Sequence, residues 1–156
     1  MNFFKITASF FGVGYIKGGG TIAAAIWSLF WYLSQHNTRS HPYMQIITTI
    51  VVIILGIWGG NKVEKDWGED SHKVVIDEIA GISITLLFVP ICWLYILIGL
   101  ILFRFFDITK PLYIRKMEQF RGGYGVMADD ILAGIYSSLV LQAIVASDLI
   151  SAYCRK

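Results

Sequence analysis

Five carboxylates beside apolar segments are the residues of this chain best suited to chemistry. They stand where hydrophobic sequence meets polar sequence, and they are Asp77, Glu78, Asp107, Asp129 and Asp130. Carboxylate oxygens are ligands that suit Mg²⁺, which also keeps waters or phosphate oxygens. Because like charges beside apolar helices are costly unless a cation neutralises them, the set predicts a hard-cation site. Five acids would hold two ions, or one ion and a general base for phosphoryl chemistry.

Helix capping offers a second explanation for these acids. We expect Asp77 and Glu78 to open one helix. The pair Asp129 and Asp130 is expected to open a later helix, and Asp107 to follow a helix end. Acids in a first helical turn are favoured by free N–H groups and by the helix dipole. Capping explains either pair alone, but it explains the whole set less well because Asp107 does not start a helix.

Two cations flank Asp107. Arg104 precedes it by three residues and Lys110 follows it by three, and residues at this spacing share a helix face. Arginine offers a bidentate fork to phosphate and lysine a point charge. Salt bridges to the acids fit the same pattern, so both interpretations stay open.

Two glycine-rich segments precede apolar helices, GGGT ending at Thr21 and GGYG at 122–125. Glycine lets the backbone approach an anion closely, and helix N-termini attract phosphate. Neither segment matches a P-loop or a dinucleotide-binding fingerprint. Each is therefore a candidate phosphate-binding turn or simply a turn.

The composition favours a helical protein in or on a membrane. Of the 156 residues, 56% are hydrophobic and 15% charged, and the mean hydropathy is +0.62. This excludes a disordered chain, and a net charge of +2 without a basic run gives no support to nucleic-acid binding. Cys92 and Cys154 predict neither a disulfide framework nor a zinc site. We expect a single domain over residues 1–156.

Four apolar stretches define the elements that must position the acids. They are too long for strands and are predicted to be helices, at about 21–33, 44–58, 79–106 and 131–150. Only the last two reach the ~20 residues that a helix needs to cross a bilayer. Polar connectors are expected between them, at 34–43, 61–76 and 107–130.

Pro90 interrupts the third stretch and predicts a helical hairpin, because proline breaks a helix. Basic residues flank the stretch on both sides, at Lys62, Lys65, Lys73, Lys110, Arg115, Lys116 and Arg121. Positive charge tends to stay cytoplasmic, so both groups share one side only if the stretch turns back. The turn would bring Asp77 and Glu78 near Asp107. The sequence thus predicts an all-α, compact multi-helix bundle, membrane-embedded or membrane-associated, with a hairpin broken near Pro90.

Three motifs in the chain resemble those of the phosphatidylglycerophosphatase A family. The chain has VVIDEIAG, FRFFDITKP and GGYGVMADDILAG in this order. Family members carry D-E-x-x-G, F-R-x-x-D-x-x-K-P and G-G-x-G-x-M-x-D-D-x-x-A-G. The match is firm over residues 70–134 and weaker at the glycine-threonine turn before the first helix. The family usually has Pro-Gly-Thr at that turn, where this chain has Gly19-Gly20-Thr21, and Tyr113 stands where a second proline is common.

The resemblance implies a Mg²⁺-dependent lipid phosphatase of the bacterial inner (cytoplasmic) membrane, with its active site facing the cytoplasm. It would hydrolyse phosphatidylglycerophosphate to phosphatidylglycerol and phosphate, so its partners are a phospholipid substrate and the membrane. It assigns catalysis and metal binding to Asp77, Glu78, Asp107, Asp129 and Asp130. It assigns phosphate binding to Arg104, Lys110 and Thr21. Asp70 matches an aspartate common in the family before the D-E pair.

Three alternatives remain. CDP-alcohol phosphotransferases also use acids and Mg²⁺ on a lipid phosphate, but their long spaced pattern is absent because Asp129 and Asp130 are adjacent. A membrane ion-binding or transport protein would use the same acid cluster, although intramembrane acids of transporters stand mid-helix. A phosphatase for another lipid phosphomonoester, such as phosphatidic acid, fits the same residues. The sequence does not specify the oligomeric state.

Overall fold

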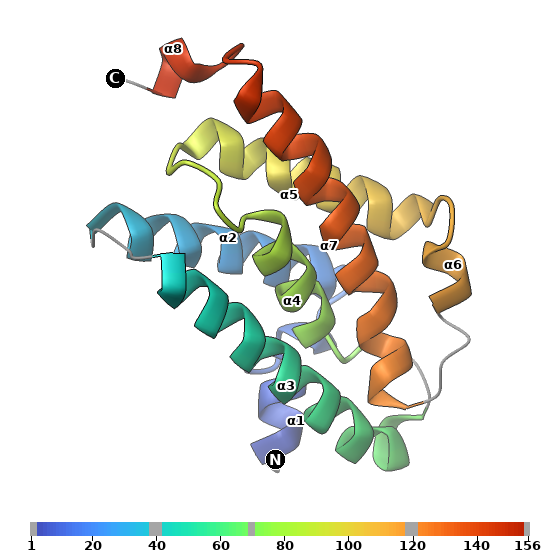
Figure 1. Cartoon of the computed structure of the whole chain (residues 1–156). Helices are drawn as coiled ribbons and strands as arrows, with labels where there is room; N and C mark the ends of the chain where they lie inside the picture. Colours follow the sequence, from blue (N-terminus) through green and yellow to red (C-terminus); the bar gives the residue numbers. More distant parts are fainter. Residues whose placement is uncertain (1–2, 38–41, 69–70, 118–121, 155–156) are drawn as a thin grey trace.

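The computed structural model describes residues 3–37, 42–68, 71–117 and 122–154 (Figure 1). Within these ranges every regular element is helical, which confirms the predicted all-α class. In chain order the elements are α1 (Phe3–Ala8), the 3₁₀ turn η1 (Val13–Tyr15), α2 (Gly19–Asn37), α3 (Pro42–Trp67), α4 (Ile76–Thr85), α5 (Trp93–Thr109), α6 (Ile114–Met117), α7 (Gly123–Ala146) and α8 (Ser151–Cys154). The single-domain organisation stays a prediction.

The longer helices run between two ends of a bundle (Figure 1). At one end, which we call the acid end, α2, α4 and α7 begin while α3 and α5 finish. The other end, which we call the hairpin end, holds the turn between α4 and α5 and the last turn of α7. Helix α7 is central because it packs against α3, α4, α5 and α6. This arrangement brings segments that are far apart in sequence together at the acid end.

Polar residues inside and apolar residues outside support association with a membrane. Ser83 and Ser137 are fully buried, whereas Ile54, Ile101 and Leu139 are 58%, 60% and 64% exposed. In the described part of the chain, α3 and α7 are long and apolar enough to cross a membrane. Exposed apolar side chains cover the outer faces of helices, as expected of a surface that contacts lipid rather than water.

The predicted helical hairpin is present as α4 and α5, with its turn around Pro90. The backbone of Phe88 adopts a φ of 61°, and its N–H donates to Gln45 Oε1 at 3.0 Å. Gln45 Nε2 in turn donates to Gln35 Oε1 at 3.0 Å. The turn is therefore held by amide side chains of α2 and α3 as well as being broken by proline.

Helix α3 is longer than predicted. Helix α3 continues through residues 61–67, which were expected to be a connector. Lysine and glutamate are good helix formers, so the polar end of α3 extends the apolar stretch without breaking it. As a result the second stretch, not the third, supplies a helix long enough to span a membrane. The third stretch is divided into helices of 10 and 17 residues.

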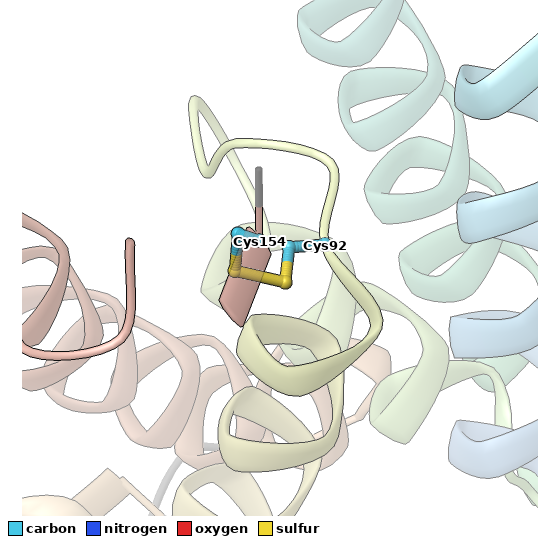
Figure 2. The surroundings of a disulfide bond; sticks show 2 residues. All are labelled: Cys92 and Cys154. Carbon is cyan, nitrogen blue, oxygen red and sulfur yellow. A yellow bond between two sulfur atoms is a disulfide. The ribbon is translucent and has the colours of Figure 1, made fainter. Parts of the chain in front are cut away.

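A disulfide joins Cys92 to Cys154, although the sequence predicted no disulfide framework. Figure 2 shows the bond between the residue before α5 and the short helix α8. The two residues are 62 positions apart, so their spacing carried no signal. They meet because the hairpin turn and the end of α7 both lie at the hairpin end.

Candidate active site

Helices α4 and α7 cross at two glycines. A Cβ atom at Gly134 would lie 2.5 Å from the carbonyl oxygen of Gly81, and one at Gly81 would lie 2.7 Å from the carbonyl oxygen of Asp130. Only glycine permits so close an approach. Asp77 precedes Gly81 by four residues, and Asp130 precedes Gly134 by four. Since residues four apart share a helix face, the crossing brings the two acids together one turn away.

Asp77, Glu78 and Asp130 form a cluster that we call the acid triad. One carboxylate oxygen from each lies within 4.8 Å of the other two. Glu78 Oε2 is buried and has no hydrogen-bond partner among the described residues. Asp77 Oδ1 accepts a hydrogen bond from the backbone N–H of Glu78 at 3.0 Å. Three of the five predicted acids therefore converge on one point.

The prediction that Asp129 and Asp130 open a helix was wrong. Helix α7 begins at Gly123 and has no acid in its first turn. The glycine-rich segment that was expected to precede the helix is its first turn instead. Capping consequently does not account for this pair, although Asp77 and Glu78 do lie in the first turn of α4.

Two ion pairs border the acid triad. Arg104 Nη1 lies 2.6 Å from Asp107 Oδ2 and 3.8 Å from Glu78 Oε1. The shorter contact is an ion pair without hydrogen-bond geometry, so the buried Nη1 and Nε groups of Arg104 have no hydrogen-bond partner among the described residues. Lys110 Nζ donates to Asp129 Oδ2 at 2.7 Å. The salt-bridge interpretation of both cations is thus realised, and Arg104 still offers N–H groups to a further acceptor.

Burial and mutual repulsion dominate the electrostatics of the acid triad. Burial raises the pKa of Asp77 well above its ordinary value of 3.8, and the charge of Glu78 raises it further. Burial also raises the pKa of Glu78, while its hydrogen bond to Asp77 and the charge of Arg104 oppose that shift. Asp107 is near enough for its charge to act on Asp130. The triad is therefore held in a state that a proton or a cation would relieve.

A pocket of about 530 Å³ opens beside the triad. Residues 15–21 line it together with His72, Glu78 and Arg104. The first turn of α2 lies so close to Glu78 that a Cβ atom at Gly20 would overlap its carboxylate. The predicted glycine-threonine turn, including Thr21, is thus placed beside the acids. Its binding of phosphate stays a prediction.

The second glycine segment serves helix packing. Gly122 has a φ of +72° and makes the turn into α7. A Cβ atom at Gly123 would overlap the carbonyl oxygen of Ile57 in α3. The N–H of Gly123 donates to Asn61 Oδ1 at 2.8 Å. This segment does not line the pocket, so its role as a turn is the one that the structure supports.

Sequence reasoning missed three polar residues at the acid end. Lys17 and His72 line the pocket, and Asn61 accepts a hydrogen bond from the N–H of Gly123 at the start of α7. Lys17 and His72 belong to connecting segments without a periodic pattern. Their only sequence signal is proximity to the glycine turn and to the D-E motif.

Comparisons with known proteins agree with this arrangement. The family model described as phosphatidylglycerophosphatase A matches residues 6–145. The chain belongs to the phosphatidylglycerophosphatase A family. A Haemophilus influenzae phosphatidylglycerophosphatase A is 41% identical over 64% of this chain and 63% of its own length. The Escherichia coli phosphatidylglycerophosphatase A is 34% identical over 80% of this chain and 73% of its own length.

A third relative has a different name. A Bacteroides thetaiotaomicron protein with the provisional name phosphatidylinositol-3-phosphatase is 43% identical over 79% of this chain and 78% of its own length. No solved structure matches the chain.

Membership of the phosphatidylglycerophosphatase A family confirms the predicted family and enzyme class, a phosphoric monoester hydrolase. It also confirms the predicted reaction, hydrolysis of phosphatidylglycerophosphate, and with it a phospholipid substrate. The roles of individual residues and the use of magnesium stay predictions. Asp70 and Arg121, which the motifs and the charge pattern singled out, lie outside the described residues.

Proposed function

We propose that this phosphatidylglycerophosphatase hydrolyses its substrate by a Mg²⁺-assisted attack of water at the acid triad. The observation that carries the proposal is the convergence of three carboxylates next to Arg104, whose buried Nε and Nη1 groups have no hydrogen-bond partner among the described residues. Such a site pairs a cation-binding group with a phosphate-binding group. That pairing is what hydrolysis of a doubly charged phosphomonoester requires.

The chemistry of the donors supports Mg²⁺ as the cation. Asp77, Glu78 and Asp130 offer only carboxylate oxygens, which are hard ligands. Glu78 Oε2 is buried without a hydrogen-bond partner among the described residues, as expected of an atom that awaits a ligand. When bound, Mg²⁺ would neutralise the phosphate oxygens and stabilise the charge that develops on them.

The neighbouring residues would bind the phosphate and move the proton. Arg104 is held by Asp107, and its buried Nε and Nη1 groups are left to donate to a phosphate oxygen. Lys110, held by Asp129, stands at the edge of the site. Thr21 and the rest of the first turn of α2 also line the pocket.

The proposed hydrolysis is a single displacement. The water oxygen bonds to phosphorus as the bond between phosphorus and the glycerol oxygen breaks. The water proton passes to one of the two acids outside the triad, Asp107 or Asp129, and the leaving oxygen takes up a proton. Those two acids remain the candidates for the general base.

We also propose that the acid end faces the cytoplasm of a bacterial inner membrane. Every lysine and arginine in the described part of the chain lies at or near the acid end; Arg39, Arg121, Arg155 and Lys156 lie outside that part. Positive charge favours the cytoplasmic side. The disulfide lies at the opposite end, and disulfides persist in oxidising compartments such as the periplasm. Two independent features therefore support one orientation.

Phosphate release from phosphatidylglycerophosphate in neutral detergent micelles tests the catalytic proposal. Release is expected with Mg²⁺, to stop with excess EDTA, and to return when Mg²⁺ is restored. Asp130→Asn should lose activity by at least about 10²-fold because it removes a ligand charge. Its melting curve, measured in EDTA, distinguishes a lost ligand from a lost fold. If a folded protein released phosphate equally well in excess EDTA, the proposed role of Mg²⁺ would be refuted.

The Bacteroides relative supplies a second candidate substrate. Its 43% identity favours testing phosphatidylinositol 3-phosphate in the same micelles. We expect phosphatidylglycerophosphate to be preferred because the family description and two relatives carry that name. A higher kcat/KM for the phosphoinositide would leave the proposed mechanism unchanged but make phosphatidylinositol 3-phosphate the preferred substrate.

A further inference from the structure

The pocket beside the acid triad is larger than one phosphate requires. Its volume of about 530 Å³ falls in the range of small-molecule sites, about 300–1,000 Å³. Glu78 and Arg104 line it on the side of the triad. Lys17 and His72 also line it, and both are exposed. The pocket therefore offers a second cationic group in addition to Arg104.

Lys17 lines the pocket and, unlike Arg104 and Lys110, has no ion-pair partner among the described residues. Arg104 and Lys110 each pair with an aspartate. Lys73 Nζ lies 5.7 Å from the centre of the Tyr15 ring and 5.8 Å from that of Trp67, which places it over two aromatic faces. No ion pair or hydrogen bond in the described part of the chain involves the Lys17 ammonium.

The substrate of the proposed reaction carries two phosphates. One is the terminal monoester that is hydrolysed, and the other is the diester that joins the headgroup to the lipid. A site that binds only the monoester would accept any lipid phosphomonoester. A separate group that recognises the diester would therefore confer specificity.

We propose that Lys17, assisted by His72, binds the phosphodiester of the substrate while the acid triad and Arg104 hold the monoester. Lys17 contributes a point charge, and His72 contributes a ring N–H. Two residues before Lys17, Tyr15 packs edge-on against Trp67, with ring centres 5.8 Å apart, which ties this wall of the pocket to α3. This inference rests on the proposed function, because it assumes that the monoester is bound at the triad.

Steady-state kinetics of Lys17→Gln test the inference. The surface KM for phosphatidylglycerophosphate is expected to rise about five- to tenfold, with kcat kept within about twofold, because a charge-assisted contact to a non-reacting group is lost. Phosphatidylglycerol, which has the diester without the monoester, should inhibit the wild type. Its inhibition constant should rise by the same factor in Lys17→Gln, and His72→Leu should shift both constants in the same direction.

Lys65→Gln is the matched control. Lys65 is an exposed lysine at the acid end that does not line the pocket, so its loss reports general attraction to anionic lipid. Equal effects of the two substitutions would overturn the inference. So would a fall in kcat at constant KM, or an unchanged inhibition constant for phosphatidylglycerol. Failure of the proposed function has a different result, namely no Mg²⁺-dependent release by the wild type.

Discussion

The close crossing of α4 and α7 makes Gly134→Ala a decisive substitution. The new Cβ atom would lie 2.5 Å from the carbonyl oxygen of Gly81, whereas ordinary contacts begin at 3.4 Å, so the helices must separate by about 0.9 Å. The obstacle is backbone and cannot rotate away. Overpacking of this kind costs about 1–3 kcal/mol. For a chain of this size that corresponds to a fall in melting temperature of about 2–12 °C.

The effect on activity should exceed the effect on stability. Asp130 lies one turn from Gly134 and would move away from Asp77 with the helix. Mg²⁺ requires nearly ideal octahedral geometry, and a displacement of about 1 Å at a catalytic site costs about 10²-fold in rate. We therefore expect Gly134→Ala to retain its helical circular dichroism while kcat/KM falls about 100-fold. Added Mg²⁺ should raise its melting temperature less than that of the wild type.

Gly59→Ala is the control for this experiment. Gly59 is also a helical glycine, but a Cβ atom there would meet its nearest neighbours at 3.9 and 4.0 Å, which is ordinary contact. Alanine is favoured over glycine in helix interiors by up to about 1 kcal/mol, so this variant should be as stable as the wild type or more so. If Gly134→Ala matched Gly59→Ala in melting temperature and activity, the glycine crossing would not be what aligns the acids.

Three further predictions follow from the charges and contacts. The raised pKa of Asp77 means that the folded state binds its proton more tightly than the unfolded state does. In EDTA the melting temperature should therefore rise as the pH falls from 8 toward 5, and Mg²⁺ should flatten this dependence. A metal-free protein that loses stability over that pH interval would contradict the assignment. Cys154→Ser should lower the free energy of unfolding by about 2–4 kcal/mol and leave kcat unchanged, because the disulfide lies at the end opposite the site. Thermal melts with and without reductant test this. A wild-type melting temperature that reductant does not change would argue against the bond. Asn61→Ala removes the acceptor for the N–H of Gly123 at 2.8 Å and should cost about 0.5–2 kcal/mol in urea unfolding; no loss would show that water replaces the side chain.

The sequence predicted the hairpin well because two independent signals coincided. Pro90 broke the third apolar stretch, and basic residues flanked it on both sides. What it did not reveal is how the turn is held, since the amides of Gln35 and Gln45 come from helices distant in sequence. The extension of α3 through residues 61–67 was missed for a simpler reason. A charged segment that continues a helix into water looks the same as a connector when only hydrophobicity is followed.

The composition of the acid cluster was predictable, but its geometry was not. Three acids from two motifs do converge, whereas Asp107 and Asp129 are each held by a cation. The decisive residues are Gly81 and Gly134, whose positions four residues after an acid make the helices cross at the right place. Glycine in a motif was interpreted mainly as a turn or as backbone access to phosphate. Close helix packing is a third use of glycine, and a single sequence does not identify its partner.

The triad also explains why folding and cation binding should be linked in this protein. Three carboxylates packed between α4 and α7 oppose folding, because burial and mutual repulsion disfavour their charged forms. A hydrophobic triad of similar size would stabilise the same crossing. The fold therefore keeps an arrangement that only a proton or a cation makes favourable. A cation that binds the folded chain and not the unfolded one raises the free energy of unfolding and so offsets the cost of burying the three carboxylates. The same unfavourable charge that weakens the metal-free protein is then the source of its affinity for the ion.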